Sequence, residues 1–178
     1  MLAAFAYAVN ITDSTVPATA PADFQAGAFS TFLNNGVDYK TQLDACFTPD
    51  QNLADHTDAF IQALKDKDWA TVKSTVTELE PEAIQDANTC HTDPQYKQVD
   101  DAYSYQEKVV KDARADPDWQ LKTIKNVRQH MAEIKANAAD AETKWNAGDY
   151  YGAGQAIGKV DAILFAPWMG KGDDLFLQ

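Results

Sequence analysis

The sequence predicts an all-α protein, on three observations. Apolar residues recur at spacings of three and four along most of the chain, which is the period of a helix with one buried face. Proline and aspartate stand just before these stretches, where they start helices. No stretch alternates apolar and polar residues with the β-branched enrichment of a strand. We expect a bundle of about six or seven helices with an extended N-terminal arm.

Length and charge limit the functional classes. A chain of 178 residues, 45% hydrophobic, suits one globular domain. Its formal net charge of −12 repels phosphate backbones and anionic surfaces, so nucleic acid is not an expected partner. No apolar run approaches the roughly 18 residues of a membrane helix, and no membrane span is expected.

Residues 1–21 form an apolar arm followed by a Thr/Ala/Pro-rich linker, ahead of a helical domain at 22–168 and a tail at 169–178. Ala6-Tyr7-Ala8 has the small-x-small form of a signal-peptidase site, but the apolar part is short and lacks a basic region. Two interpretations stay open: residues 1–8 are the remnant of a signal peptide, or an exposed arm of the mature chain.

The first half of the domain is marked by clear helix signals. Pro21 opens a helix that stops at Asn34-Asn35-Gly36, and a short helix follows at 37–47. Thr48-Pro49-Asp50-Gln51 is a capping box for a third helix, and the chain turns at 65–68. The returning helix and a short one that ends at Cys90 carry these apolar positions: Trp69, Val72, Val76, Leu79, Ile84 and Ala87.

The second half contains three longer helices. Asp93-Pro94 opens one with the stripe Tyr96, Val99, Tyr103, Gln106, Val110 and Ala113. Asp116-Pro117 opens the longest, a helix of about 28 residues with a bundle-like stripe of Leu121, Ile124, Val127 or Arg128, Met131, Ile134, Ala138, Ala141 and Trp145. The last runs from Asp149 to about Phe165, before Pro167.

Two antiparallel hairpins organise this layout. Asp68-Trp69 and Asp149-Tyr150 stand at matching corners, where the aspartate caps the second helix and the aromatic ring packs under it. Duplication and convergence explain the match equally well. Gly152-Ala153-Gly154 begins like a dinucleotide loop, but Ile157 stands where its third glycine is needed and no strand precedes it. We interpret Gly154-x-x-x-Gly158 as a flat strip for close packing, expected against the helix that ends at Trp145.

The two cysteines predict a structural disulfide. Cys46 and Cys90 each end a helix, so both can lie at one end of the bundle. The alternative, a metal site of Cys46, Cys90, His91 and His56, lacks the short ligand spacings of structural zinc. Asn10-Ile11-Thr12 matches the N-glycosylation pattern. Together with the acidic charge, these features favour a secreted or extracellular protein, or one in the lumen of the secretory pathway.

No catalytic constellation is present in the sequence. The histidines have no glutamate three positions before them, which excludes the di-iron motif, and His130 is expected at the edge of the core. There is no GxSxG, and the acidic clusters at 112–118 and 173–174 lack the calcium-loop pattern. We therefore predict no enzyme, no cofactor and no metal.

The two ends carry surplus apolar residues. Leu2, Phe5 and Tyr7 lie in the arm, and Phe176 and Leu177 follow Gly170-Lys171-Gly172. Exposed apolar ends often dock on a partner subunit. The sequence thus favours a non-enzymatic structural or interaction protein that self-associates through its termini, as a filament or another extracellular assembly. The alternative is a carrier of a lipid or other apolar ligand between helices, suggested by 4 Trp, 7 Tyr and 8 Phe.

The chain resembles small secreted helical proteins of unknown function from ciliates and related protists, over about Phe24 to Phe165. The specific parts are the cysteine pair, Asp68-Trp69, Trp145, Gly148-Asp149-Tyr150 and Gly158. The resemblance implies an extracytosolic, disulfide-bonded helical domain and brings no catalytic residues. The Gly-Asp-Tyr corner is also similar to tetratricopeptide hairpins, but their period of about 34 residues is absent.

Overall fold

The computed structural model describes residues 16–66, 68, 70, 71, 74 and 85–170. This part of the chain is helical and contains no strand, so the predicted all-α class is confirmed. It has eight α-helices with defined bounds and a 3-10 turn: α1 (Ala20–Phe32), α2 (Tyr39–Cys46), α3 (Gln51–Asp66), α5 (Asn88–Thr92), η2 (Pro94–Tyr96), α6 (Lys97–Ala115), α7 (Trp119–Gln129), α8 (Met131–Asn146) and α9 (Tyr150–Phe165). The N-terminal arm lies outside these residues.

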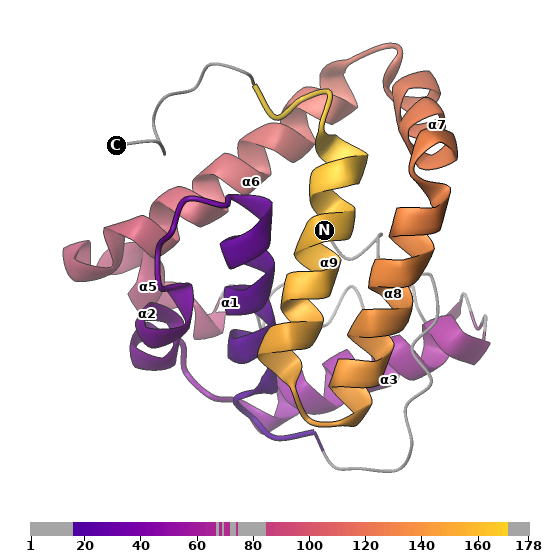
Figure 1. Ribbon diagram of the computed structural model, residues 1–178. Coiled ribbons are helices and arrows are strands. Elements are labelled where there is room, and N and C mark those ends of the chain that lie inside the picture. The colour runs from indigo at the N-terminus through magenta and orange to yellow at the C-terminus, as the bar shows by residue number, and fades with distance from the viewer. Residues whose placement is uncertain (1–15, 67, 69, 72–73, 75–84, 171–178) are drawn as a thin grey trace.

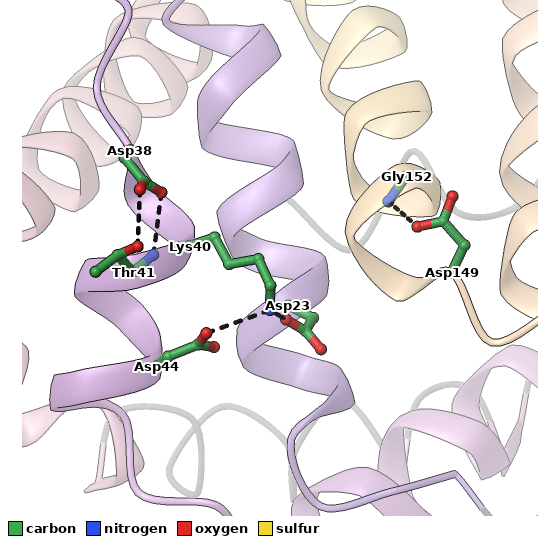
Figure 2. Close-up of polar contacts among 7 residues, drawn as sticks. All are labelled: Asp23, Asp38, Lys40, Thr41, Asp44, Asp149 and Gly152. Carbon is green, nitrogen blue, oxygen red and sulfur yellow. Dashed lines mark hydrogen bonds and ion pairs between the residues drawn. The ribbon is translucent and has the colours of Figure 1, made fainter.

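Aspartate side chains cap α2 and α9, and the cap of α9 at Asp149 was predicted. The carboxylate of Asp38 accepts from the Thr41 amide at 3.1 Å, and that of Asp149 accepts from the Gly152 amide at 2.8 Å (Figure 2). Asp68 accepts from the Thr71 amide at 3.2 Å, so both predicted corners share their cap. Hydrogen bonds from the threonine side chain and amide lower the pKa of Asp38 and of Asp68. The rest of the first hairpin corner lies outside the described residues.

The corner between α8 and α9 is built from two consecutive capping motifs. Gly148 has φ +77°, a conformation that favours glycine, and its amide donates to the Trp145 carbonyl at 2.9 Å. The Asp149 amide donates to the Lys144 carbonyl at 2.8 Å, which completes a Schellman motif. Asp149 then caps α9, so the chain reverses within three residues and forms the antiparallel hairpin visible in Figure 1.

The prediction of one helix of about 28 residues after Pro117 is wrong. The chain forms two helices there, α7 and α8, which meet at His130. His130 has φ −114° and ψ 18°, outside the helical region, and it is exposed rather than at the core edge. Ile134, Ala141 and Trp145 on α8 are buried as predicted, whereas α7 buries no residue. The break separates α7, whose Leu121 and Ile124 are exposed, from α8, whose stripe is buried, and it raises the helix count above the predicted number.

The core gathers around α1 and α9, which lie side by side in the centre of the molecule with α8 against α9 (Figure 1). The Trp145 ring is buried between Phe24, with ring centroids 5.7 Å apart, and Tyr150, at 4.8 Å. On α6 the buried valines are Val99, as predicted, and Val109, which lies one position before the predicted Val110. The aromatic wedge predicted at the hairpin corner is therefore confirmed.

The glycine strip of α9 packs on α1, not on α8 as predicted. A Cβ added to Gly154 would lie 2.8 Å from the Phe24 carbonyl carbon and closer still to its oxygen. One added to Gly27 on α1 would lie 2.8 Å from the Gln155 amide nitrogen. The Thr31 hydroxyl also donates to the Gln155 carbonyl at 2.9 Å. Both helices present glycine at the contact, so their backbones touch, and α8 carries no such surface.

Replacing Gly154 by alanine is expected to lower the free energy of unfolding by about 2 kcal/mol. The methyl group meets backbone that cannot rotate away, at the upper end of the roughly 1–3 kcal/mol cost of overpacking. The better helix propensity of alanine offsets about 1 kcal/mol of that cost. Urea unfolding followed by circular dichroism measures the change. Lys159→Ala, at an exposed position of α9, is the control. Equal stability of the two variants would contradict the backbone contact.

Candidate interaction surface

The large apolar side chains that the described part of the chain leaves exposed all lie on α7. Trp119 is 43% exposed, Leu121 70% and Ile124 48%. Leu121 and Ile124 were predicted in the buried stripe of the long helix, and that prediction is wrong for both. A concentration of exposed apolar side chains on one short helix is the feature that marks binding surfaces in soluble proteins.

Four residues of α7 point outward together. Ile124, Lys125 and Arg128 lie three, four and seven residues after Leu121, so the four side chains share one face of the helix. All four are exposed. We call these four residues the outer face of α7. Trp119 is not included, because two residues of helix turn the chain by about 200° between Trp119 and Leu121.

The opposite side of α7 is fastened to the rest of the molecule. The Asn126 amide donates to the Ile163 carbonyl on α9 at 3.1 Å. At the start of α7, the Asp116 carboxylate binds the Lys122 ammonium at 2.5 Å and the Trp168 indole at 2.9 Å. The Lys122 contact, then the indole and the Asp118 amide, lower the pKa of Asp116 to about 2. These contacts hold α7 at the edge of the bundle (Figure 1), and among the described residues its outer face stays exposed.

The charge of α7 is opposite to that of the chain. Its eleven residues include Lys122, Lys125, Arg128 and no acidic residue, in a protein of net charge −12. Lys122 pairs with Asp116, whereas Lys125 and Arg128 form no ion pair in the described residues. The outer face therefore combines two apolar side chains with two unpaired cations. Sequence reasoning missed it, although an eleven-residue stretch without an acid was visible in the letters.

The predicted disulfide is present. The Sγ atoms of Cys46 and Cys90 are 2.01 Å apart, and the bridge joins the end of α2 to α5. His91 lies with Nδ1 2.9 Å from a carboxylate oxygen of Asp100. The bonded sulfurs are not available as metal ligands, which overturns the alternative site with His91 and His56. Within the described ranges, no group of three or more His, Cys, Asp or Glu side chains could hold a metal ion.

The other predicted site residues lie outside the described part of the chain. They are the glycosylation candidate Asn10 and the assembly candidates Leu2, Phe5, Tyr7, Phe176 and Leu177. Of the acidic cluster at 112–118, Asp112 pairs with Lys108 at 3.3 Å and Asp116 with Lys122, so the two carboxylates are engaged separately. Among the described helices, none has the length and apolar character needed to cross a membrane.

A buried carboxyl on α9 was not anticipated from the sequence. Asp161 is 1% exposed and lies three residues after Gly158. Neither of its carboxyl oxygens accepts a hydrogen bond from any residue that the structure describes. Burial raises the pKa of Asp161 to about 7, because the charged form loses its hydration. Asp161 is therefore a group that can be neutral in the folded protein near neutral pH.

Comparison with known proteins adds no relative to this picture. No protein-family model, no curated protein and no solved structure matches the chain. The resemblance to small secreted protist proteins stays a prediction, and the function is argued from the surface of the molecule.

Proposed function

We propose that this protein is a non-enzymatic structural or interaction protein that self-associates outside the cytosol. The observation that carries the proposal is the outer face of α7, where Leu121 and Ile124 are 70% and 48% exposed. A lone domain gains nothing from leaving two adjacent aliphatic side chains in water. Covering them in an assembly removes that unfavourable hydration, at about 25 cal/mol per Å² of apolar surface.

The apolar ends supply the complementary elements. Leu2, Phe5 and Tyr7 lie in the N-terminal arm, and Phe176 and Leu177 in the C-terminal tail. An end of one copy that docks on the helical domain of the next makes a heterologous contact, in which the two surfaces differ. Such contacts repeat from copy to copy, which produces a ring when the rotation closes and a filament when it does not.

An extracytosolic location is supported by the disulfide. A bridge between Cys46 and Cys90 persists in oxidising compartments and is rare in the cytosol. The glycosylation pattern at Asn10 and the resemblance to secreted protist proteins favour the same location. We therefore propose secretion, or residence in the lumen of the secretory pathway.

The carrier alternative gains no support from the described aromatic residues. Phe29 packs against Tyr39 and Tyr103, with ring centroids 5.4 Å and 4.8 Å apart. Trp145 packs against Phe24 and Tyr150 in the same way. These rings fill the interior by contacting one another, which is how aromatic side chains stabilise a core.

Purified protein is expected to form concentration-dependent oligomers, and deletion of residues 1–15 together with 171–178 is expected to leave a monomer. Val16 and Ala20 are buried, so a deletion that stops at residue 15 preserves the start of the core. Sedimentation velocity over a hundredfold range of concentration measures the association, and electron microscopy distinguishes filaments from rings. Unchanged far-ultraviolet circular dichroism shows that the truncated domain is folded. A full chain that stays monomeric throughout would overturn the proposal.

A further inference from the structure

We propose that the outer face of α7 is the docking surface for residues 173–177, Asp-Asp-Leu-Phe-Leu, of a neighbouring copy. This inference rests on the proposed self-association and names its two contact partners. The surface is a described helix face with known exposure and charge, and the occupant is a segment of the same sequence that follows the last described residue, Gly170.

Charge selects this segment over the N-terminal arm. Residues 173–177 place two carboxylates beside three apolar side chains, and the outer face of α7 places Lys125 and Arg128 beside Leu121 and Ile124. The two carboxylates of the segment thus complement the two cations of α7, and its apolar side chains complement the two aliphatic side chains of the same face. Residues 1–15 contain a single charged side chain, Asp13, so the N-terminal arm has one carboxylate for the two cations of α7. The arm therefore fits this surface less well than the tail does.

Length agrees with the assignment. Five residues in extended form span about 17 Å, at roughly 3.3 Å each. The outer face of α7 runs from Leu121 to Arg128, seven residues further on, which at about 1.5 Å each gives roughly 11 Å. The segment can therefore run along the whole outer face, with its acidic residues near the cations and its apolar residues over Leu121 and Ile124.

The fold also places the start of α7 and the last described residues of the chain at one end of the molecule. The Trp168 indole donates to Asp116, directly before α7, so the chain passes the start of α7 two residues before Gly170. A second copy that approaches this end brings its own tail to the same region. A contact between neighbours then needs no rearrangement of the helical domain, because the outer face of α7 is exposed among the described residues and Gly170, the last of them, is exposed as well.

The direct test is binding of a synthetic peptide of residues 170–178 to the full chain with its own tail altered by Asp173→Asn, Asp174→Asn and Phe176→Ser. Fluorescence anisotropy is expected to show saturable binding that weakens about tenfold or more when Lys125→Glu and Arg128→Glu are added, because attraction becomes repulsion at two pairs. A peptide carrying Asp173→Lys and Asp174→Lys is expected to bind the charge-reversed protein again. No binding, or binding indifferent to charge reversal, overturns the inference.

A mixing experiment tests that the tail comes from a neighbour. Full chain with Lys125→Glu and Arg128→Glu keeps its tail, and full chain with the three tail substitutions keeps its α7. An equimolar mixture is expected to form pairs that light scattering detects and that neither chain forms through this contact alone. Absence of such pairs, with the peptide bound, places the tail on its own copy and overturns the assignment to a neighbour.

The two proposals can fail separately. If the full chain self-associates but the peptide does not bind α7, the docking inference fails and the proposed function stands. If the peptide binds with the expected charge dependence but the full chain is monomeric, the proposed function fails and α7 is the docking surface for the tail within one molecule. Lys159→Glu, at an exposed position of α9, is the control for a charge change away from α7 and is expected to leave peptide binding unchanged.

Discussion

Asp161→Asn is expected to stabilise the folded protein by about 4 kcal/mol above pH 7 and to change its stability little near pH 4. The pKa of Asp161 is raised to about 7 by burial, from about 3.9 in an unfolded chain. Each pKa unit corresponds to about 1.4 kcal/mol, so deprotonation of the buried carboxyl costs the folded state about 4 kcal/mol. Asparagine is neutral at every pH and has nearly the shape of the protonated acid.

The sign of the pH dependence follows from proton binding. Between about pH 4 and pH 7 the folded protein keeps the Asp161 proton that the unfolded chain releases. The contribution of this group to stability is therefore full below pH 4, falls as the pH rises, and is constant above pH 7. Asp116, whose pKa is lowered to about 2, acts in the opposite sense at acid pH, and it does so equally in both proteins. The difference between wild type and variant isolates Asp161.

Urea unfolding of both proteins at pH 4, 5.5, 7 and 8.5 gives this difference. The stability curves are expected to coincide at the lowest pH and to separate progressively up to pH 7. Glu107→Gln, on the exposed side of α6, is the matched control, and its curve is expected to run parallel to that of the wild type. Parallel curves for Asp161→Asn would show that the carboxyl is hydrated or paired in the folded protein.

The elements that sequence reasoning predicted well are those with local causes. Asp68 and Asp149 cap helices because a carboxylate accepts from an amide three residues later, and that geometry depends on few neighbours. Asn34, with φ +47°, and Gly36, with φ +75°, end α1 where the letters predicted. The pairing of Cys46 with Cys90 was predicted from two expected helix ends, and the structure places Cys46 at the end of α2 and Cys90 within the short helix α5.

The errors arise where the outcome depends on distant parts of the chain. The break at His130 carries no proline or glycine, so neither of the usual sequence signals marks it. Gly154 packs against Phe24, about 130 residues earlier, and the sequence offered no way to choose α1 over the adjacent helix. Periodicity likewise does not distinguish a stripe that is buried from one that is presented to solvent, which is how Leu121 and Ile124 were misplaced.

The candidate surface was predictable in part. The sequence predicts self-association through the apolar ends, which lie outside the described residues, and it assigns Leu121 and Ile124 of the exposed α7 face to the core. Local charge was the missing signal, since Lys125 and Arg128 beside apolar residues in an acid-free stretch are typical of an exposed binding helix. The buried Asp161 had no signal, because an aspartate in an apolar helix can as well face solvent.

Removal of the disulfide is the other change with a large expected effect. Cys46→Ala with Cys90→Ala opens a loop of 44 residues, which is expected to cost about 4 kcal/mol on the chain-entropy relation. For a domain of this size that corresponds to a fall of roughly 8–16 °C in melting temperature. Both sulfurs are buried, so wild type reduced with a thiol is measured beside the double variant. If the reduced wild type and the double variant lose the same stability, the loss comes from the missing bridge and not from the smaller side chains.

Removal of the disulfide is expected to destabilise some helices more than others. The bridge and the hydrogen bond from the Thr48 amide to the Asp86 carbonyl, at 2.9 Å, close the two ends of the chain segment that contains α3. The packing of α1 on α9 does not involve this closure. Hydrogen exchange should therefore accelerate more in α3 than in α9 when the bridge is absent, because the loop opens before the glycine strip separates. Equal acceleration in both helices would show that the bridge supports the whole bundle rather than one loop of it.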